Sequence, residues 1–586
     1  MIKLLKNFSY KEWLIVLVCI ILTCINVSLE LRIPDYMSEI TRLIQSSSES
    51  MRHDILVQGG YMVLCSFGSL AAGIVTGFLS AMLAARFSMD LRYKIFAKVQ
   101  GFGELEMKKF STSSLITRNT NDVSQVEMLI AMGLTMMLRA PIMCIWAISK
   151  IINKSIEWSM LVGGFVVLLM AIIIALMIIV VPKFKIIQKL IDKMNGVTRE
   201  NLTGIRVIRA FNAEKFQSDR FEDVNETLTK TQLFNQRAFA ILAPVMSLVM
   251  QGLTFGIYLI GAYLIYNSVM TEKITLFSNM VVFSSYGMQV IMSFLMLALI
   301  FMLAPRAAIS ATRINEVLDS KDSIKDGTFD DDTEETGTIV FKDVSFKYPD
   351  ADDYILKNIS FDVKKGETVA FIGSTGSGKS TLINLIPRLY DVTDGEVLVD
   401  GVNVKEYKLS ALNNKIGYVA QKAMMFTGSV TDNITFGETK NTITKKDIEE
   451  AIEVAQAKEF VDKLDGKLDA HVARGGTNLS GGQKQRLSIA RAIARKPEIY
   501  IFDDTFSALD YKTDSILRKE LKKHTKDATN LIVAQRIGTI MNADKIIVLD
   551  NGECVGIGTH KDLLKSCDVY KEIALSQLSE EELKNA

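Results

Sequence analysis

The amino-acid sequence predicts an all-α domain of six transmembrane helices followed by an α/β domain that contains a phosphate-binding loop. The first half of the 586-residue chain carries six apolar runs, each near the ~20 residues that a membrane-spanning helix needs. In the second half, strand-like and helix-like segments alternate, as in an α/β domain. There, an apolar strand-like run at residues 368–372 leads into the pattern G-x-x-x-x-G-K-S at residues 373–380.

The composition agrees with a membrane protein and excludes several other classes. Hydrophobic residues make up 49% of the chain, and the mean hydropathy is +0.22. The formal net charge is +1, so we expect no nucleic-acid partner. The six cysteines form no C-x-x-C pair and are expected to be small buried thiols. The sequence therefore predicts neither a metal site of cysteines nor a disulfide framework.

The apolar runs are expected to be the transmembrane helices of a domain that covers residues 1–317. They lie at about residues 13–33, 56–85, 128–152, 158–182, 238–266 and 274–304. The first run follows three lysines but precedes no small-x-small cleavage site. We therefore interpret it as a membrane anchor and not as a cleaved signal peptide.

Lysine and arginine predict the orientation of these helices. The segments between the second and third runs and between the fourth and fifth runs are long and basic, whereas the other three connections are shorter and less basic. Basic connections face the cytoplasm, so the N-terminus and the phosphate-binding loop are expected there too. Both segments read as helices that continue into the cytoplasm, with breaks at residues 111–115 and 203–204.

Polar residues inside the apolar runs have two interpretations, a substrate path or structural pairing and snorkelling near a helix end. They are Glu30, Arg32, Arg139, Gln251 and Gln289. For Glu30 and Arg32 the structural interpretation is favoured. Met288, Met292 and Met296 repeat at i, i+4 and i+8 in the sixth run. This stripe indicates helix packing, or the adaptable wall of an apolar cavity.

After the membrane domain, the composition becomes polar. Residues 318–336 contain a run of aspartate and glutamate and are expected to be a solvated acidic linker. The α/β domain is expected at residues 337–575, and residues 576–586 are expected to be a C-terminal tail.

The pattern at 373–380 carries specific chemistry. Its glycines let backbone N–H groups converge on phosphate oxygens, while Lys379 reaches the β- and γ-phosphates and Ser380 ligates Mg²⁺. ATP and Mg²⁺ are therefore the expected cofactors. The expected nucleotide contacts here are Gly373, Ser374, Thr375, Gly376, Ser377, Gly378, Lys379, Ser380 and Thr381.

Two further motifs follow in the same domain. Residues 479–483 read Leu-Ser-Gly-Gly-Gln, and an apolar strand-like run at 499–502 ends in Asp503 and Asp504. Asp503 is expected to hold Mg²⁺ through its shell. With these motifs the chain resembles the ATP-binding cassette (ABC) transporters over nearly its whole length. The order of six spans and then a cassette resembles a half-transporter of the type IV exporters, with an ABC ATPase as its second domain.

The resemblance implies roles for further residues. Tyr348 matches the aromatic residue that stacks on adenine, and Gln421 matches the glutamine that touches Mg²⁺ and the attacking water. Asp510 closes the loop that crosses between two cassettes, and residues 204–211 resemble a coupling segment. The resemblance implies that ATP lies between one chain's phosphate loop and the partner's signature motif, so that ATP favours the closed dimer. The signature contacts are Ser480, Gly481, Gly482 and Gln483.

Two positions depart from the family pattern. Asp504 stands where the family has the glutamate that activates water, and Gln535 stands where it has a histidine. Aspartate is one methylene shorter, and glutamine cannot shuttle a proton. The expected catalytic residues are thus Asp504, Gln535 and Gln421, at a site that holds ATP and cleaves it slowly. This pattern is similar to heterodimeric multidrug exporters of bacteria, whose second half-transporter supplies the competent site.

The sequence therefore predicts an ATP-driven exporter subunit of the bacterial plasma membrane. The expected partners are a second half-transporter, membrane lipid and a small apolar or amphipathic substrate. A homodimeric lipid or peptide exporter is an alternative, but both of its sites would be impaired. An ATP-gated channel or regulatory subunit is a third interpretation, disfavoured because the spans are mostly apolar.

Overall fold

The computed structural model describes residues 2–6, 8–45, 51–152, 156–331, 333–349, 351–440 and 442–578. By its internal contacts the chain forms two compact units. The membrane unit is Met1–Gln100 with Thr112–Ser320, and the cassette unit is Gly101–Ser111 with Lys321–Ala586. Most of the expected C-terminal tail, from residue 579 onward, lies outside the described residues.

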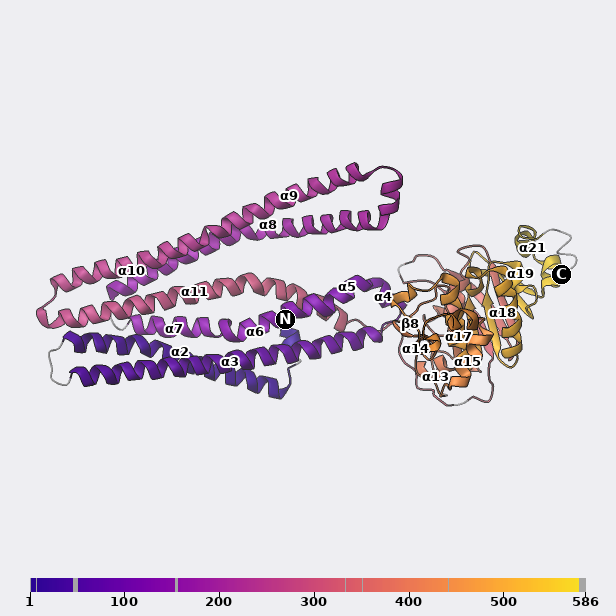
Figure 1. The fold of residues 1–586 in the computed structure, drawn as a ribbon, viewed down its shortest axis with the longest axis horizontal. Helices are drawn as coiled ribbons and strands as arrows, with labels where there is room; N and C mark the ends of the chain where they lie inside the picture. Colours follow the sequence, from indigo (N-terminus) through magenta and orange to yellow (C-terminus); the bar gives the residue numbers. More distant parts are fainter. Residues whose placement is uncertain are drawn as a thin grey trace. The chain divides into compact units, whose positions relative to one another are not determined.

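The membrane unit is all-helical (Figure 1). Among the described residues, six helical segments are long and apolar enough to cross a membrane, which confirms the predicted fold class of this half. The helices are α1 (Ile2–Leu5), α2 (Tyr10–Gln45), α3 (Met51–Gln100), α5 (Thr112–Thr117), α6 (Val123–Met132), α7 (Arg139–Ile152), α8 (Ile156–Ala210), α9 (Glu214–Ala240), α10 (Leu242–Asn267) and α11 (Met270–Leu318). Two π-helical turns, Arg118–Asp122 and Gly133–Met137, flank α6.

The helices extend well beyond the apolar runs. α8 continues to Ala210 and α9 begins at Glu214, so these two run side by side as a long hairpin (Figure 1). The break predicted at residues 203–204 is wrong, because α8 passes through it and the chain turns at residues 211–213. A single glycine such as Gly204 is tolerated within a helix whose backbone hydrogen bonds remain intact. The turn uses Asn212 at φ 52°, a conformation that asparagine adopts readily.

Aromatic and apolar side chains from α2, α7, α8, α10 and α11 form a core of the membrane unit. The indole N–H of Trp158 donates to the carbonyl of Ile257 at 3.2 Å, and its ring lies 4.9 Å from that of Phe283. The Tyr286 hydroxyl donates to the carbonyl of Leu31 at 2.8 Å. Buried aromatic rings contribute most when their polar ends are bonded in this way.

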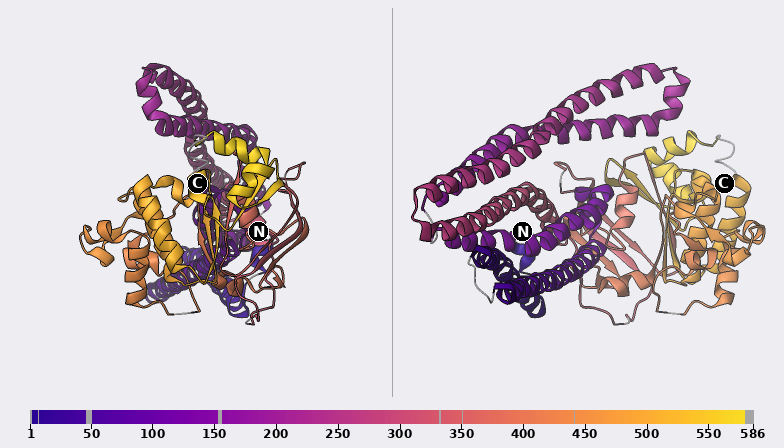
Figure 2. Two further views of the ribbon diagram at one scale, coloured as in Figure 1. Left: turned by 90° about the vertical axis from the view of Figure 1, so that its right-hand side faces the viewer. Right: turned by 60° about the vertical axis from the view of Figure 1, so that its left-hand side comes forward.

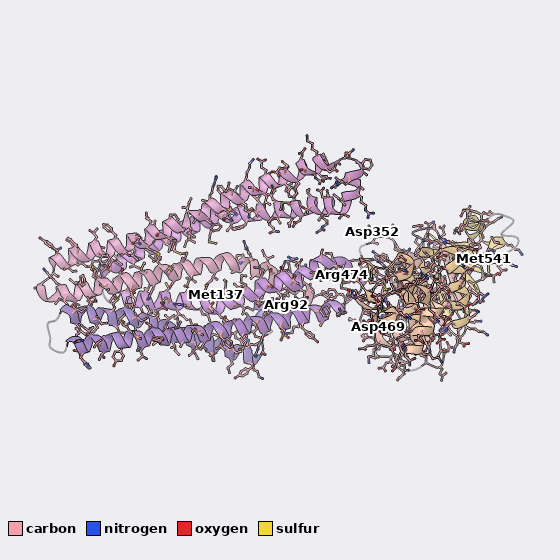
Figure 3. All side chains as sticks on the ribbon, in the orientation of Figure 1. Arg92, Met137, Asp352, Asp469, Arg474 and Met541 are labelled. Carbon is pink, nitrogen blue, oxygen red and sulfur yellow. The ribbon has the colours of Figure 1, made fainter. Side chains whose placement is uncertain are left out.

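Ion pairs tie α3, α6 and α11 together outside this core. Arg92 of α3, labelled in Figure 3, lies 3.3 Å from Glu127 of α6. The buried carboxylate of Asp122 accepts a hydrogen bond from Ser310 at 2.9 Å and lies 3.3 Å from Arg313. These last two contacts join the π-helical turn before α6 to the C-terminal part of α11.

The cassette unit is α/β and is built on two main sheets. In its described part, a six-stranded sheet has the order β12-β11-β3-β10-β9-β6, parallel except for β12, and a four-stranded antiparallel sheet has the order β2-β1-β4-β5. The strands are β1 (Ile339–Phe346), β2 (Leu356–Val363), β3 (Thr368–Gly373), β4 (Asp394–Val399), β5 (Val402–Asn403), β6 (Ile416–Val419), β7 (Gly428–Ser429), β8 (His471–Val472), β9 (Ile499–Asp503), β10 (Thr529–Val533), β11 (Lys545–Asp550) and β12 (Glu553–Gly558).

Helices cover the strands of the six-stranded sheet, as the left view of Figure 2 shows. They are α12 (Lys379–Asn384), α13 (Leu409–Lys415), α14 (Val430–Ile434), α15 (Lys445–Val454), α16 (Lys458–Asp462), α17 (Gly481–Ala494), α18 (Tyr511–His524), α19 (Ile537–Ile540), α20 (His560–Ser566) and α21 (Asp568–Leu575). Strands β3, β9 and β10 are almost wholly buried, in agreement with the apolar residues that make up most of each strand. The ends of β3 and β9 carry the predicted site residues.

Two segments outside the predicted domain belong to the cassette unit. Helix α4 (Glu104–Phe110), between α3 and α5 in the chain, packs with it. The segment expected to be a solvated linker is also attached. Asp326 accepts the backbone N–H of Leu409 at 2.7 Å, and Gly327 lies so close to Glu406 that a Cβ there would meet its carbonyl oxygen at 2.1 Å. Acidic composition alone did not indicate this packing.

Candidate nucleotide site

The phosphate-binding loop connects β3 to α12, as its sequence predicts. Neighbouring atoms lie too close to Gly373 and Gly378 for a larger residue. An added Cβ would lie 2.0 Å from the carbonyl oxygen of Leu549 at Gly373, and 2.7 Å from the side chain of Leu356 at Gly378. The ammonium of Lys379 lies inside the loop and donates to the carbonyls of Gly373 at 3.0 Å and Ser374 at 2.7 Å. Burial lowers the pKa of Lys379, while the nearby carboxylates of Asp504 and Asp503 oppose that shift.

Ser380 and Asp503 meet beside this loop. The Ser380 hydroxyl donates to Oδ1 of Asp503 at 2.8 Å. The hydroxyl at the start of α12 and the carboxylate at the end of β9 therefore lie side by side. Asp503 is buried, and this burial raises the pKa of its carboxyl group, partly offset by the Ser380 hydrogen bond. Hydroxyl and carboxylate oxygens are the donor types that Mg²⁺ prefers. The residues present therefore fit the expected cation.

Asp504 is the point where three distant segments converge. Its Oδ2 accepts a hydrogen bond from the side-chain amide of Gln421 at 3.0 Å and another from that of Gln535 at 2.9 Å. The sequence predicted these three residues as the catalytic set, and the structure brings them together on one carboxylate oxygen. The two amides help to leave Asp504 only 7% exposed.

The backbone of Asp504 is fixed on both sides. Its N–H donates to the carbonyl of Val533 at 3.1 Å, and its carbonyl accepts from the hydroxyl of Ser507 at 2.8 Å. Its φ of 44° and ψ of 32° lie in the left-handed region, which aspartate tolerates better than most residues. With the main chain held, the length of the side chain decides where the carboxylate lies.

Tyr348, for which the family resemblance implies a contact with adenine, lies next to the phosphate loop. Its hydroxyl is 3.3 Å from the hydroxyl of Thr381. The ammonium of Lys108, from α4, lies 4.4 Å from the centre of the Tyr348 ring and donates to the Tyr390 hydroxyl at 3.3 Å. No sequence motif indicated Lys108 or Tyr390 at this site, because only the fold brings α4 to the aromatic cluster.

The signature motif lies at the start of α17. Ser480 is the N-cap, with its hydroxyl accepting from the N–H of Gln483 at 3.3 Å, while the Gln483 side chain accepts the N–H of Ser480 at 2.8 Å. A Cβ on Gly482 would lie 3.4 Å from the carbonyl of Ala508, so the motif adjoins the loop that ends at Asp510. Asp510 caps α18 by accepting the N–H of Thr513 at 3.0 Å, and this hydrogen bond lowers its pKa.

The structure thus assembles the predicted residues into two groups. Tyr348, the phosphate loop, Gln421, Asp503, Asp504 and Gln535 form one group. Residues 480–483 and Asp510 form another, and within the described chain no hydrogen bond joins this second group to the phosphate loop. Sequence reasoning missed Gln577, whose side chain contacts the backbone at Gln535 and Ile537.

The membrane unit contains a cavity of about 340 Å³ whose wall combines thioethers with a few polar groups. Arg139 and Glu30 form an ion pair there at 2.6 Å, the pairing that we expected for Glu30. Among the described residues, the buried Oε1 of Gln289 has no hydrogen-bond partner. Five methionines line the described wall, namely Met143, Met250, Met288, Met292 and Met296. The predicted methionine stripe therefore faces a cavity.

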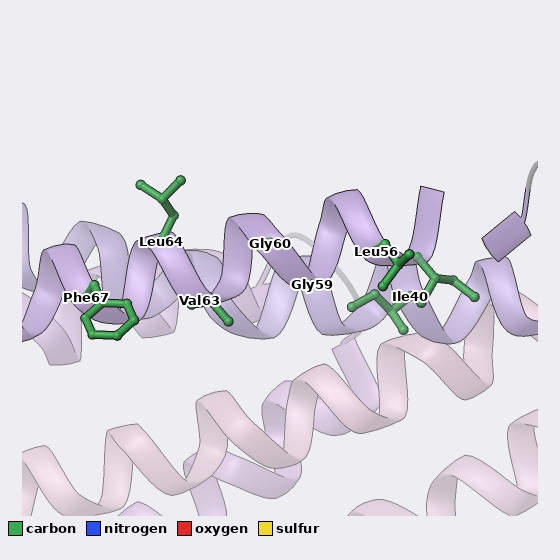
Figure 4. Close-up of a pocket in the computed structure, with 8 residues that line it drawn as sticks. Ile40, Leu56, Gly59, Gly60, Val63, Leu64 and Phe67 are labelled. Carbon is green, nitrogen blue, oxygen red and sulfur yellow. The ribbon is translucent and has the colours of Figure 1, made fainter. Parts of the chain in front are cut away.

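An open groove of about 620 Å³ lies along α2 and α3 (Figure 4). Its described lining is apolar and includes Gly59 and Gly60 together with Leu56, Val63 and Phe67.

Comparison with known proteins agrees with this geometry. The family model for the ABC transporter transmembrane region matches residues 16–304, and the model for the ABC transporter matches residues 356–507. An ABC transporter ATP-binding protein of Mycobacterium tuberculosis is 40% identical over 88% of this chain and 87% of its own length. An ATP-dependent lipid A-core flippase of Mannheimia succiniciproducens is 30% identical over 86% of each chain.

Two further matches cover almost the whole chain. A multidrug resistance ABC transporter ATP-binding and permease protein of Lactococcus lactis is 28% identical over 92% of this chain and 90% of its own. The solved structure of a bacterial Atm1-family ABC exporter with ATP bound shares the fold, with a TM-score of 0.81 over 97% of this chain and 98% of that chain, at 21% identity. This chain therefore belongs to the ABC transporter family, as a multi-pass exporter half-transporter that couples ATP hydrolysis to transport.

Proposed function

We propose that this chain is one subunit of a heterodimeric exporter that moves hydrophobic or amphipathic compounds out of the cytoplasm. In this proposal the chain's own phosphate loop forms a slow ATP site, and a different half-transporter supplies the glutamate and histidine of the fast site. The observation that carries the proposal is Asp504, a short carboxylate with a fixed backbone and two amide donors on one oxygen.

The geometry at Asp504 supports binding without fast cleavage. A general base must come within about 3 Å of the attacking water. The missing methylene withdraws the carboxylate by about 1.5 Å, and a misplacement of about 1 Å costs roughly 100-fold in rate. Gln535 donates a hydrogen bond but exchanges no proton at physiological pH. The departures at Asp504 and Gln535 leave Lys379 and the loop amides unchanged, so this site still binds the phosphates.

Mg²⁺ is expected at the same site. Ser380, Asp503 and Gln421 are the residues that would hold it, since the first two lie 2.8 Å apart and the third contacts the adjacent Asp504. When bound, the cation neutralises charge that develops on the β- and γ-phosphates. The chain's own residues then bind the nucleotide through the loop amides and the Lys379 ammonium, and orient the water through Gln421.

The intact signature motif supports a second, competent site. Ser480 and Gly482 keep the residue types that offer hydroxyl and backbone donors to a γ-phosphate held by the partner. A homodimer would combine this signature only with its own slow loop. A heterodimer instead gives the signature a partner loop with a glutamate, which is the simpler reason for it to remain complete.

The methionine-lined cavity supports amphipathic cargo. Thioether side chains adapt to ligands of different shape, and the Glu30–Arg139 pair and Gln289 supply a few polar contacts. Two relatives agree with cargo of this kind, because one is named for multidrug resistance and another as a lipid A-core flippase.

Co-purification from the native membrane tests the pairing, and drug-stimulated ATPase of the complex tests the cargo. We expect a second half-transporter with a glutamate and a histidine at the positions of Asp504 and Gln535. Stimulation by lipid alone would favour a flippase. Transport into inside-out vesicles against a gradient requires hydrolysis, whereas downhill flow supported by ATP binding alone would favour a channel.

A further inference from the structure

Gln577, in the turn after α21, forms two hydrogen bonds with the backbone of the segment that contains Gln535. Its side-chain amide nitrogen donates to the carbonyl of Gln535 at 2.8 Å, and its side-chain oxygen accepts the N–H of Ile537 at 2.8 Å. One planar amide thereby spans the backbone on both sides of Arg536. Both bonds have good length, and together they fix position and rotation of this segment.

The segments on both sides of this contact pack in one apolar cluster. Ile537 is fully buried at the start of α19, in the cluster that also contains Tyr570 and Ala574 of α21. Leu578 packs against the same cluster, and its N–H donates to the carbonyl of Ala574 at 3.0 Å. Gln577 thus lies between two segments that pack in this apolar cluster.

From Gln577, a continuous set of hydrogen bonds leads to the nucleotide site. Gln577 holds the backbone of Gln535, the Gln535 side chain donates to Asp504 at 2.9 Å, and Gln421 donates to the same oxygen at 3.0 Å. Gln535 is a solvent-exposed residue, although its hydrogen bond to Asp504 is partly buried. The backbone that Gln577 holds therefore helps to set the direction of the Gln535 side chain.

We propose that Gln577 is a positioning residue of the ATP site, which acts through Gln535 to keep ATP bound at the slow site. The inference rests on the proposed function, because it uses Gln535 as the donor that replaces the family's histidine at the γ-phosphate. A consequence is that α21 and the turn after it influence nucleotide retention from outside the ATP pocket. Gln577 makes no contact with the nucleotide in this account.

The test is a double-mutant cycle on full-length protein loaded with radiolabelled ATP and Mg²⁺, read as the rate of label release into excess unlabelled ATP. We expect Gln577→Ala to speed release about three- to tenfold, the effect of losing one or two exposed hydrogen bonds. Gln577→Glu keeps the acceptor for Ile537 but loses the donor to Gln535, so it should also speed release. Ser576→Ala is the matched control, because that hydroxyl bonds only locally to the carbonyl of Ile573.

The background variant Gln535→Ala separates positioning from general stability. In it, Gln577→Ala should add no further acceleration, since the residue that it positions has lost its amide. Unchanged release in Gln577→Ala and Gln577→Glu, or equal acceleration with and without the Gln535 amide, would overturn the proposal. If Gln577→Ala fails to fold, Gln577→Glu provides the same cycle. If the wild type turns ATP over quickly, the slow-site proposal fails by itself, and the cycle is then read in turnover rates.

Discussion

The side-chain amide nitrogen of Gln535 lies 2.9 Å from Oδ2 of Asp504, the oxygen that Gln421 also contacts at 3.0 Å. Two neutral amide groups thus donate hydrogen bonds to Asp504, which stands where the family pattern has the glutamate that activates water. The two hydrogen bonds hold the carboxylate in place, and the aspartate side chain is one methylene shorter than the glutamate of the family pattern. In the proposed function, side-chain length separates the binding of ATP from its cleavage at this site, and a single substitution tests this.

Asp504→Glu should raise ATP turnover at this chain's own site by about 10- to 100-fold, because it returns the carboxylate to the distance that a general base needs. The measurement is steady-state ATPase of the complex in a Gly482→Asp background, which silences the partner's site in our account. Residual activity then reports on this site alone. An unchanged rate would show that Gln535 limits hydrolysis, and Asp504→Glu with Gln535→His is the variant that decides between these causes.

Gly482→Asp alone should lower turnover of the complex by about 100-fold, as does removal of one donor from a transition-state site. The new carboxylate would lie near the carbonyl of Ala508 and repel the partner's γ-phosphate. Asn551→Asp adds the same charge in an exposed turn and serves as the control. Full activity of Gly482→Asp would mean that this signature completes no competent site.

Asp503→Asn should stabilise the nucleotide-free protein and abolish stabilisation by ATP with Mg²⁺. Because the pKa of Asp503 is raised on folding, the folded protein holds its proton more tightly than the unfolded chain does. The ionised carboxylate therefore costs stability at pH values above that pKa. Thermal unfolding at pH 7 should show an increase of roughly 2–4 °C.

The same variant has a definite pH dependence. Its advantage should shrink as the pH falls through the raised pKa of Asp503, where the wild-type carboxyl becomes neutral too. A thermal advantage that stays constant down to pH 4, or a variant that ATP with Mg²⁺ still stabilises, would contradict the role given to Asp503.

Arg139→Ala should destabilise the membrane unit and lower transport, because it leaves Glu30 without its partner at 2.6 Å. Both side chains are about one-third exposed, so we expect a cost below the 3–5 kcal/mol of a fully buried pair, about 1–3 kcal/mol. The charge-swapped variant with Glu30→Arg and Arg139→Glu should recover stability. Equal thermal unfolding of the wild type and Arg139→Ala would show that the pair contributes nothing.

Much of the nucleotide site was predictable because its residues lie close together in the sequence at a fixed spacing. The glycines, Lys379 and Ser380 must follow one strand at fixed spacing, so the pattern determines both the loop and its contacts. Asp504 and Gln535 were identified through the positions that they occupy in a known pattern. Their meeting with Gln421 on one oxygen was visible only in the fold, since 83 residues separate Gln421 from Asp504 along the chain.

Other features had no local signal. Gln577 is a single exposed glutamine after a short helix, and nothing in its neighbours distinguishes it from a solvated residue. The position of the turn after α8 was missed because Gly204 weakens a helix without ending it, whereas the actual turn at 211–213 depends on Asn212. The acidic residues of the linker that the structure describes are solvent-exposed, as their charge indicated, but composition could not indicate the backbone contacts, such as that of Gly327, that hold the segment to the cassette.

The central claim is that this polypeptide holds ATP but relies on a different partner to cleave it quickly. The most direct test compares steady-state ATPase of the chain purified alone with that of the complex isolated from its native membrane, at equal molar amounts. We predict slow hydrolysis with retained nucleotide for the single polypeptide and fast, substrate-stimulated hydrolysis for the complex. Fast hydrolysis and uphill transport by two identical copies of this chain would contradict the claim.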